Sequence, residues 1–299
     1  MKKKIAVLIL MAVALGALAG NRVDKLRKHL MDPNDKYVIV VAHRGDWRGA
    51  PENSLLAFQN CIDMGVDMIE IDVQMTKDSA LIIMHDEWVD RTTDKKGRIR
   101  DYTLAEIRAM KLKTMHAATA TRHQVPTLEE VLNLCKGKIL INIDKGYDYF
   151  PQVLALLQKT GTVDQVVIKS GVAAEQVMKN NRSAVENSIY MPIVGIAEKN
   201  AEQLLQANID LIHPVAIECC FPTFGDHERQ MLDLLSKNNC KIWVNSLWAS
   251  LNAGHDDELA VDEKNPDEAW GWILKQGATL IQTDRPAELI RYLKKHHRR

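Results

Sequence analysis

The sequence predicts a closed α/β barrel of the (β/α)8 TIM type, and three observations lead to this fold class. Short runs rich in Val, Ile and Leu alternate with amphipathic segments along most of the chain, which is typical of parallel strands joined by helices. The alternation repeats too often for a small open sheet and suits a closed eight-stranded barrel. The length of 299 residues fits one large domain of this kind.

Nine runs have the character of strands, which is one more than the barrel needs. They cover 37–43, 68–75, 80–85, 138–144, 165–169, 189–195, 209–217, 241–246 and 278–284. The link between the second and third runs is too short for the helix that connects parallel strands. We therefore predict that 80–85 folds back on 68–75 as an antiparallel hairpin arm, which leaves eight strands for the barrel.

The register of this hairpin decides where His85 points. If residues 78–79 form a two-residue turn, Asp72 lies opposite His85, and opposite residues share one face of a sheet. Glu70 shares that face because side chains alternate along a strand. A shift of one residue would turn His85 to the other face. We predict that the arm brings His85 to the same side as both acids.

Residues 87–126 carry one short helical pattern, at 103–110. We predict that they form an insertion over the C-terminal mouth of the barrel and not a second domain. The next helix is expected to begin after Thr127, with Glu130 completing a capping box. The barrel domain is predicted to span 37–299.

The first residues have the pattern of a secretory signal peptide. Three lysines at 2–4 precede an apolar run at 5–15, and the small residues Ala17 and Ala19 follow. The apolar run is short for a membrane span. We predict a signal peptide at 1–19, cleavage near Ala19, export to the periplasm or the medium, and no stable membrane insertion.

Composition narrows the range of partners. The 39 basic and 39 acidic residues give a formal net charge of zero, so nothing favours nucleic acid as a partner. The five cysteines fit no metal-binding spacing, and the pattern does not choose a disulfide. The sequence makes no prediction of oligomeric state.

Barrel active sites gather at the C-terminal ends of the strands, and polar residues gather at these positions here. They are His43, Arg44, Glu70, Asp72, His85, Asp144, Lys145, Lys169, Asn245, Ser246 and Asp284. Any one of them, taken alone, is more often structural than catalytic. Their joint position favours a site.

The acids indicate a metal and the histidines indicate proton transfer. Glu70, Asp72 and Asp144 cannot all stay ionised at one site without a cation, and an all-oxygen set suits Mg²⁺, Ca²⁺ or Mn²⁺ better than zinc. His43 and His85 are then free to act as acid and base. With Arg44 or a lysine to hold an anion, the set fits metal-assisted cleavage of a phosphodiester.

At this point the sequence resembles the glycerophosphodiester phosphodiesterase family. The matching segments are HRGDWRGAPENSLLAF (43–58), GVDMIEIDVQMTKD (65–78), LIIMHDEWVDRTTDKKG (81–97), VPTLEEVL (125–132) and IQTDRP (281–286). The resemblance covers the chain from about residue 37 to its end. It implies a TIM-type barrel, one divalent cation, commonly Mg²⁺ or Ca²⁺, and a small-molecule glycerophosphodiester substrate that is hydrolysed to glycerol 3-phosphate and an alcohol.

By position in these motifs, His43 and His85 match the acid/base pair of the family. Glu70 and Asp72 match metal ligands, and Arg44 matches a phosphate contact. A mechanism proposed for the family uses the substrate's own 2-hydroxyl as the nucleophile, which is favourable because that group is already held near the phosphorus.

Three departures from the family pattern concern residues of the site. The usual Glu-x-Lys reads NIDKG here, so Asp144 replaces the glutamate, and strand alternation would point Lys145 away from the site if the strand continued. Lys169 is then a second candidate for the phosphate. The usual Trp-Thr-x-Asn reads WVNSLW, which makes Asn245 and Trp248 the candidate substrate contacts. The third departure is Asp-Ser in place of Asp-Gly in the hairpin turn.

Two other functions remain open. A phospholipase C- or D-like enzyme of the same barrel type would act on lipid or lysolipid phosphodiesters, and Trp47, Trp88 and Trp248 near the mouth favour it. A non-catalytic phosphodiester-binding barrel is favoured only by the altered pair of Asp144 and Lys145, and it needs no pair of histidines.

Overall fold

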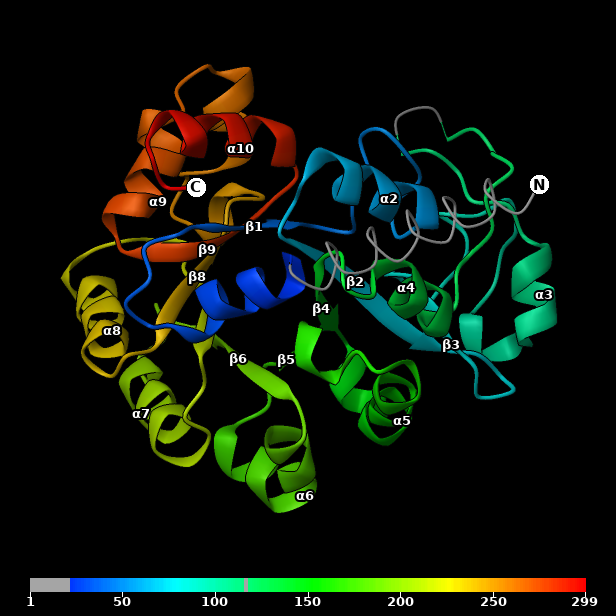
Figure 1. Cartoon of the computed structure of the whole chain (residues 1–299), viewed down its shortest axis with the longest axis horizontal. Helices are drawn as coiled ribbons and strands as arrows, with labels where there is room; N and C mark the ends of the chain where they lie inside the picture. Colours follow the sequence, from blue (N-terminus) through cyan, green and yellow to red (C-terminus); the bar gives the residue numbers. More distant parts are fainter. Residues whose placement is uncertain (1–21, 116–117) are drawn as a thin grey trace, which may run out of the picture.

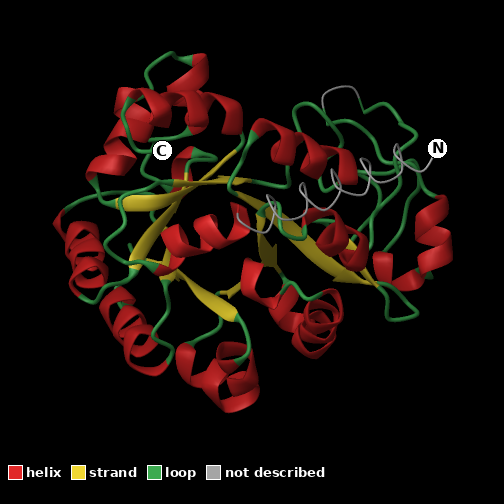
Figure 2. Cartoon of the chain, viewed as in Figure 1, coloured by secondary structure: helices red, strands yellow, loops and turns green. Residues whose placement is uncertain are grey.

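The computed structural model of the chain describes residues 22–115 and 118–299, and in it eight parallel strands close into a barrel (Figures 1 and 2). The strands follow the order β1-β9-β8-β7-β6-β5-β4-β2, and pairing of β1 with β2 closes the ring. They are β1 (Ile39–Ala42), β2 (Met68–Met75), β4 (Leu140–Asp144), β5 (Val166–Ser170), β6 (Ile189–Gly195), β7 (Ala216–Cys220), β8 (Lys241–Asn245) and β9 (Ala278–Thr283). The predicted (β/α)8 fold class is confirmed.

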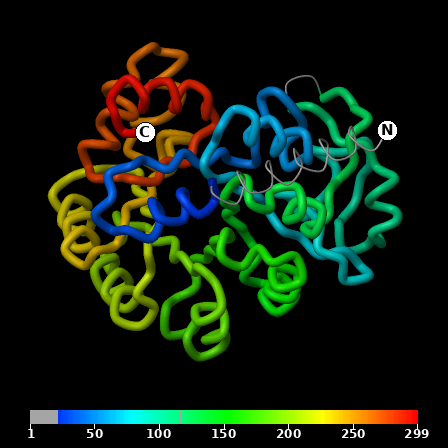
Figure 3. Tube along the Cα trace, viewed as in Figure 1, coloured from blue at the N-terminus to red at the C-terminus, as the bar shows by residue number. Residues whose placement is uncertain are grey.

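The helices form an outer ring around the strands (Figure 2). They are α2 (Leu55–Met64), α4 (Leu128–Cys135), α5 (Phe150–Thr160), α6 (Ala174–Glu186), α7 (Ala201–Leu211), α8 (Asp226–Lys237), α9 (Trp272–Lys275) and α10 (Pro286–Lys295). The C-terminal end of the chain lies beside the start of β1, because Val38 N–H donates to the carbonyl of Arg298 (Figure 3). No helix within the described residues is long and apolar enough to cross a bilayer.

The N-terminal end of the barrel is closed by apolar packing. Side chains alternate along the strands, and Met68, Leu140 and Trp243 are among the inward residues of one buried cluster. The helix at 22–31 adds Leu26 and Leu30 to this cluster. The polar residues at the other ends of the same strands therefore face the C-terminal mouth. The predicted signal peptide at 1–19 lies outside the described residues.

The helix starts that the sequence predicted are present. Thr127 caps α4, its hydroxyl accepting from the N–H of Glu130 while the Glu130 carboxylate accepts from the N–H of Thr127. The insertion carries α3 (Leu104–Ala109), whose cap at Thr103 has the same reciprocal arrangement. The insertion and the hairpin arm share a small apolar core that includes Ile82 and Ile107. The insertion therefore packs against the arm of β2.

The predicted strand at 209–217 is wrong in its bounds. Residues up to Leu211 belong to α7, and β7 begins at Ala216 and runs to Cys220. The apolar run misled because it combines the end of an amphipathic helix with the start of a strand, and Leu211 is 41% exposed. The shift places Glu218 in the middle of β7 instead of after its end.

The hairpin arm is present, but its predicted register is wrong by one residue. β3 (Leu81–Ile83) runs antiparallel to β2, with Val73 opposite Ile83. Asp72 therefore lies opposite Met84, whose N–H donates to the Asp72 carbonyl at 2.9 Å. His85 lies beyond the end of the ladder, where the chain bends, so the shift does not turn it away from the acids.

The turn contains three residues, 77–79, instead of two. Thr76 N–H donates to the Ala80 carbonyl at 3.0 Å, and the Thr76 hydroxyl donates to the Asp78 carboxylate at 2.6 Å. Ser79 closes the turn with φ 63°, in the left-handed region. Three-residue hairpin loops commonly end in such a residue.

We expect Ser79→Gly to raise the free energy of unfolding by about 0.5–1 kcal/mol, because glycine adopts the left-handed conformation without the cost of a Cβ atom. Urea unfolding measures the change. Ser79→Ala, which keeps the Cβ, is the control and should give no gain. A lower midpoint for the glycine variant would contradict the turn described here.

Candidate active site

Three carboxylates meet at the mouth of the barrel as the sequence predicted. Glu70 and Asp72 point inward from β2, and Asp144 pairs with Asp72 at the end of β4. Ligand oxygens of the three residues all lie within 4.8 Å of one another. Glu70 and Asp72 are each only 1% exposed. Such closeness of buried acids calls for a positive charge between them.

The electrostatics of the two buried acids differ. Burial, followed by the charge of Asp72, raises the pKa of Glu70 to about 7. Burial also acts to raise the pKa of Asp72, but His85, Lys145 and Arg44 outweigh it and lower that pKa. The pKa values of Glu70 and Asp72 are therefore shifted in opposite directions, as expected for acids that share one site.

The donor set fits a divalent cation. Asn53 donates to Oδ2 of Asp72 at 2.9 Å, whereas Oδ1 is buried without a hydrogen bond in the described protein. Lys145 Nζ lies 3.5 Å from that Oδ1. A free, buried carboxylate oxygen beside two further carboxylates is a suitable ligand for a hard cation such as Mg²⁺ or Ca²⁺.

His43 follows β1 and is oriented by a carboxylate. Its Nδ1 lies 2.9 Å from Oδ1 of Asp284, which also accepts a hydrogen bond from Trp47 Nε1 at 2.5 Å. Burial favours the neutral ring, but the bond to Asp284 and the charge of Glu70 raise the pKa of His43 overall. With Nδ1 engaged, Nε2 is the ring nitrogen available to a substrate.

His85 has a similar arrangement at the end of the hairpin arm. Its Nδ1 lies 2.7 Å from Oδ1 of the next residue, Asp86. Its backbone carbonyl accepts hydrogen bonds from Gln74 and from Lys145, which fixes the bend after β3. Each histidine thus has a carboxylate at Nδ1, and no hydrogen bond to its Nε2 is found among residues 22–115 and 118–299.

Arg44 lies at the acids, and a network of ion pairs links it to His85. Its backbone N–H donates to Glu70 at 3.0 Å. Its guanidinium lies 3.3 Å from Glu52, which binds Arg91 through both carboxylate oxygens at 2.6 and 2.8 Å. Arg91 also donates to Asp86, the residue that holds His85. These contacts keep the candidate phosphate contact and His85 in a fixed relation.

The two candidate lysines lie on either side of the acids. The expectation that strand alternation points Lys145 away does not apply, because β4 ends at Asp144 and Lys145 has φ 59°. Its ammonium turns back to the His85 carbonyl and Asp72. Lys169 is 3% exposed and lies 2.9 Å from Glu218 and 3.9 Å from Asp144. A direct phosphate contact by either lysine stays a prediction.

Asn245 and Trp248 have different environments. Asn245 is buried, donating to Glu218 at 2.8 Å and accepting from Trp243 at 2.7 Å. Trp248 is 47% exposed and presents an edge-on contact to His43, with ring centroids 6.1 Å apart. The position of Trp248 suits a substrate contact, whereas Asn245 supports the buried pair of Glu218 and Lys169.

Sequence reasoning assigned no role to Glu52, Asn53, Asp86, Arg91 or Glu218. Glu52 and Asn53 lie within the segment that resembles the family, and Asp86 directly follows His85, so these signals were present but did not specify a partner. Arg91 and Glu218 act through residues far away in the sequence, which a local pattern does not reveal.

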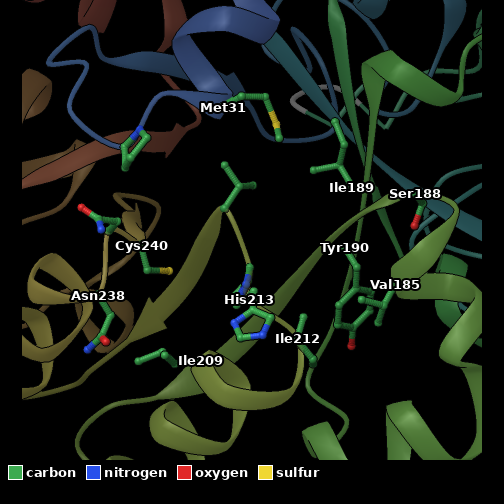
Figure 4. Close-up of a pocket in the computed structure, with 14 residues that line it drawn as sticks. Met31, Val185, Ser188, Ile189, Tyr190, Ile209, Ile212, His213, Asn238 and Cys240 are labelled. Atoms are coloured by element: carbon green, nitrogen blue, oxygen red, sulfur yellow. The ribbon is translucent and has the colours of Figure 1, made fainter.

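A cavity of about 380 Å³ lies at the other end of the barrel (Figure 4). His213, Tyr190 and Cys240 line it together with Met31 from the helix at 22–31. None of the described residues that line it is acidic. It is therefore separate from the acids and histidines at the C-terminal mouth.

Comparison with known proteins places the chain in a family. The profile of the glycerophosphoryl diester phosphodiesterase family matches residues 43–288. A glycerophosphodiester phosphodiesterase of Caldanaerobacter subterraneus is 37% identical over 139 residues, which are 44% of this chain and 57% of that protein. One from Bacillus subtilis is 36% identical over 176 residues, 53% of this chain and 58% of that protein. The chain thus matches little more than half the length of these relatives.

Solved structures share the fold over more of the chain. A glycerophosphoryl diester phosphodiesterase from Parabacteroides distasonis has a TM-score of 0.73 at 26% identity and covers 92% of both chains. A phosphodiesterase from Oleispira antarctica, solved with the product sn-glycerol 3-phosphate, has a TM-score of 0.64 at 17% identity, covering 86% of this chain and 97% of that one. Because the family profile spans most of the sequence, this chain belongs to the glycerophosphoryl diester phosphodiesterase family.

Proposed function

We propose that the chain hydrolyses glycerophosphodiesters to glycerol 3-phosphate and an alcohol. The observation that carries the proposal is the pair of histidines, His43 and His85, each held at Nδ1 by a carboxylate beside the acid cluster. Binding alone needs no such pair, which disfavours a non-catalytic phosphodiester-binding barrel. Family membership supports the same reaction.

The histidines divide the proton transfers between them. One removes the proton from the substrate's 2-hydroxyl as it attacks the phosphorus, and the other protonates the leaving oxygen of the alcohol, which gives a cyclic phosphate. Water then attacks the phosphorus and gives its proton to the second ring, while the first ring returns its proton to the 2-oxygen, which leaves as the hydroxyl of glycerol 3-phosphate.

The carboxylates of Asp284 and Asp86 fix the orientation of the two rings. The ring that acts as base becomes an imidazolium when it takes the proton, and the ring that acts as acid begins as one. Arg44, beside Glu70 and Asp72, is placed to bind a phosphoryl oxygen by a charge-assisted hydrogen bond.

Glu70, Asp72 and Asp144 would hold one divalent cation, Mg²⁺ or Ca²⁺, with Mn²⁺ also compatible with oxygen ligands. When bound, it would neutralise charge on the phosphoryl oxygens. Lys145 and Lys169 border the same acids and keep the cluster compact.

The alternative function is that of a phospholipase of the same barrel type. The specific observation in its favour is the exposure of Trp88 and Trp248, at 48% and 47%. We expect water-soluble glycerophosphocholine to be turned over faster than lysophosphatidylcholine, and the protein not to sediment with phosphatidylcholine–phosphatidylglycerol vesicles. Preference for the lysolipid together with vesicle binding that Trp248→Ala abolishes would favour the alternative function.

We further propose that the protein is exported after removal of residues 1–19, on the basis of the sequence pattern alone. N-terminal sequencing of the secreted protein tests this. A chain that begins near Gly20 supports export, and an intact Met1 contradicts it.

A further inference from the structure

Asp257 is a buried carboxylate in the segment between β8 and β9, away from the acid cluster. It is 3% exposed and lies just before the short helical turn η5 (Glu258–Asp262). Four residues donate to it: Ser246 Oγ at 2.7 Å, Trp270 Nε1 at 2.9 Å, Thr283 Oγ1 at 2.9 Å and the backbone N–H of Asp284 at 2.7 Å. One side chain thus joins the ends of β8 and β9.

Packing alone does not explain a carboxylate at this place. Burying a charge is costly even when it is hydrogen-bonded, and burial raises the pKa of Asp257 to about 6 against the effect of its donors. An apolar side chain of similar volume would fill the same space at lower cost, but it would accept none of these hydrogen bonds. A carboxylate offers acceptors only, so it can receive every one of these donors at once.

The contacts of Asp257 continue to the proposed catalytic histidine. Its Oδ2 accepts from the backbone N–H of Asp284. The side chain of Asp284 in turn accepts from His43 Nδ1 at 2.9 Å and from Trp47 at 2.5 Å. Asp257 therefore holds the backbone of the residue whose carboxylate orients His43.

We propose that Asp257 is a positioning residue for His43 and acts through Asp284. It keeps the Asp284 carboxylate where the His43 ring presents Nε2 to the substrate, and it touches neither substrate nor metal ligands. The consequence for turnover rests on the proposed function, whereas the effect on the orientation of His43 does not. Misplacing a catalytic group by about 1 Å can cost about 10²-fold in rate.

The first experiment compares Asp257→Asn with the wild type. The amide presents N–H groups to donors that need an acceptor, so the Asp284 segment has to shift. We expect kcat on glycerophosphocholine to fall by about 10–100-fold, KM to change by less than about threefold and Mn²⁺ affinity to stay the same. Asp262→Asn is the matched control, because Asp262 is 54% exposed in the same segment and binds Arg285; its kcat should equal that of the wild type.

A double-mutant cycle separates positioning from a general loss of stability. In the Asp284→Asn background, Asp257→Asn should lower kcat by less than about twofold further, because the two residues act as one unit. Multiplicative losses would overturn the proposal. If Asp257→Asn does not fold, Thr283→Val, which removes one donor to Asp257, replaces it in the cycle with the same expectation of non-additivity.

A readout without turnover keeps this inference separate from the proposed function. In ¹⁵N-histidine NMR spectra, assigned with His43→Ala and His85→Ala, Asp257→Asn should shift the His43 ring signals and leave those of His85 in place. An unchanged His43 signal would overturn the proposal. A shifted signal in a protein that turns over no diester would reject the proposed function alone.

Discussion

Replacing His43 with alanine is expected to lower kcat for glycerophosphodiesters by about 10³-fold, within the range by which a positioned acid or base accelerates a reaction. The same loss is expected for His85→Ala, because each ring is held at Nδ1 and, within the described part of the chain, leaves Nε2 without a hydrogen bond. Divalent-metal affinity, measured by calorimetry, should change little, since neither ring belongs to the acid triad. Steady-state kinetics at saturating metal measures the loss.

A histidine from the other end of the barrel provides the control. His213 lines the cavity at the N-terminal end and has φ 52°, a conformation that asparagine also tolerates. His213→Asn should keep the wild-type kcat. Near-normal turnover in His43→Ala or His85→Ala would reject the two-histidine mechanism.

Glu70→Gln is expected to weaken divalent-cation binding by at least about 100-fold, the upper end of the loss from removing a partner that only supports a ligand. Asp72→Asn should do the same, because each change removes one negative charge and keeps the shape of the side chain. Titration with Mn²⁺ or Ca²⁺ measures the affinity. Asp262→Asn, an exposed carboxylate, serves again as the control.

Thermal unfolding provides an independent test of metal binding at the acid triad. Bound cation stabilises the folded state by mass action, so metal should raise the Tm of the wild type and leave that of Glu70→Gln nearly unchanged. Without metal, Glu70→Gln should have a higher Tm than the wild type. The variant lacks the buried acid, whose pKa is raised to about 7 by burial and by Asp72. A wild type that is insensitive to metal would contradict the assignment of the triad.

The barrel, the folded-back arm and the acid triad could be predicted from the sequence because they depend on the periodicity of apolar and polar residues. Alternation puts Glu70 and Asp72 on one face of β2, and the end of β4 supplies Asp144. The exact turn was not predictable, since serine seldom adopts the left-handed conformation that Ser79 has, and this conformation changes the register by one residue. The direction of the Lys145 side chain was left open for a similar reason, because it depends on where β4 ends and on the left-handed conformation of Lys145.

The supporting contacts of the site could not be predicted because they join residues that are distant in the sequence. Asp284, which follows β9, reaches His43, which follows the neighbouring strand β1, and Arg91 from the insertion reaches Glu52. The run at 209–217 shows a different limit, because apolar residues of a helix and of a strand are not distinguished when they are adjacent. Local pattern thus indicated the candidate reacting groups, and only the closed barrel showed which residues hold them.

The most direct test of the account is product analysis with glycerophosphocholine and the metal-loaded protein. We expect glycerol 3-phosphate and choline in equal amounts. Both products should disappear when a chelator removes the metal and should form again when Mg²⁺ or Ca²⁺ is added. Formation of choline phosphate and glycerol would contradict the proposed function. So would the absence of turnover of every glycerophosphodiester with Mg²⁺, Ca²⁺ and Mn²⁺.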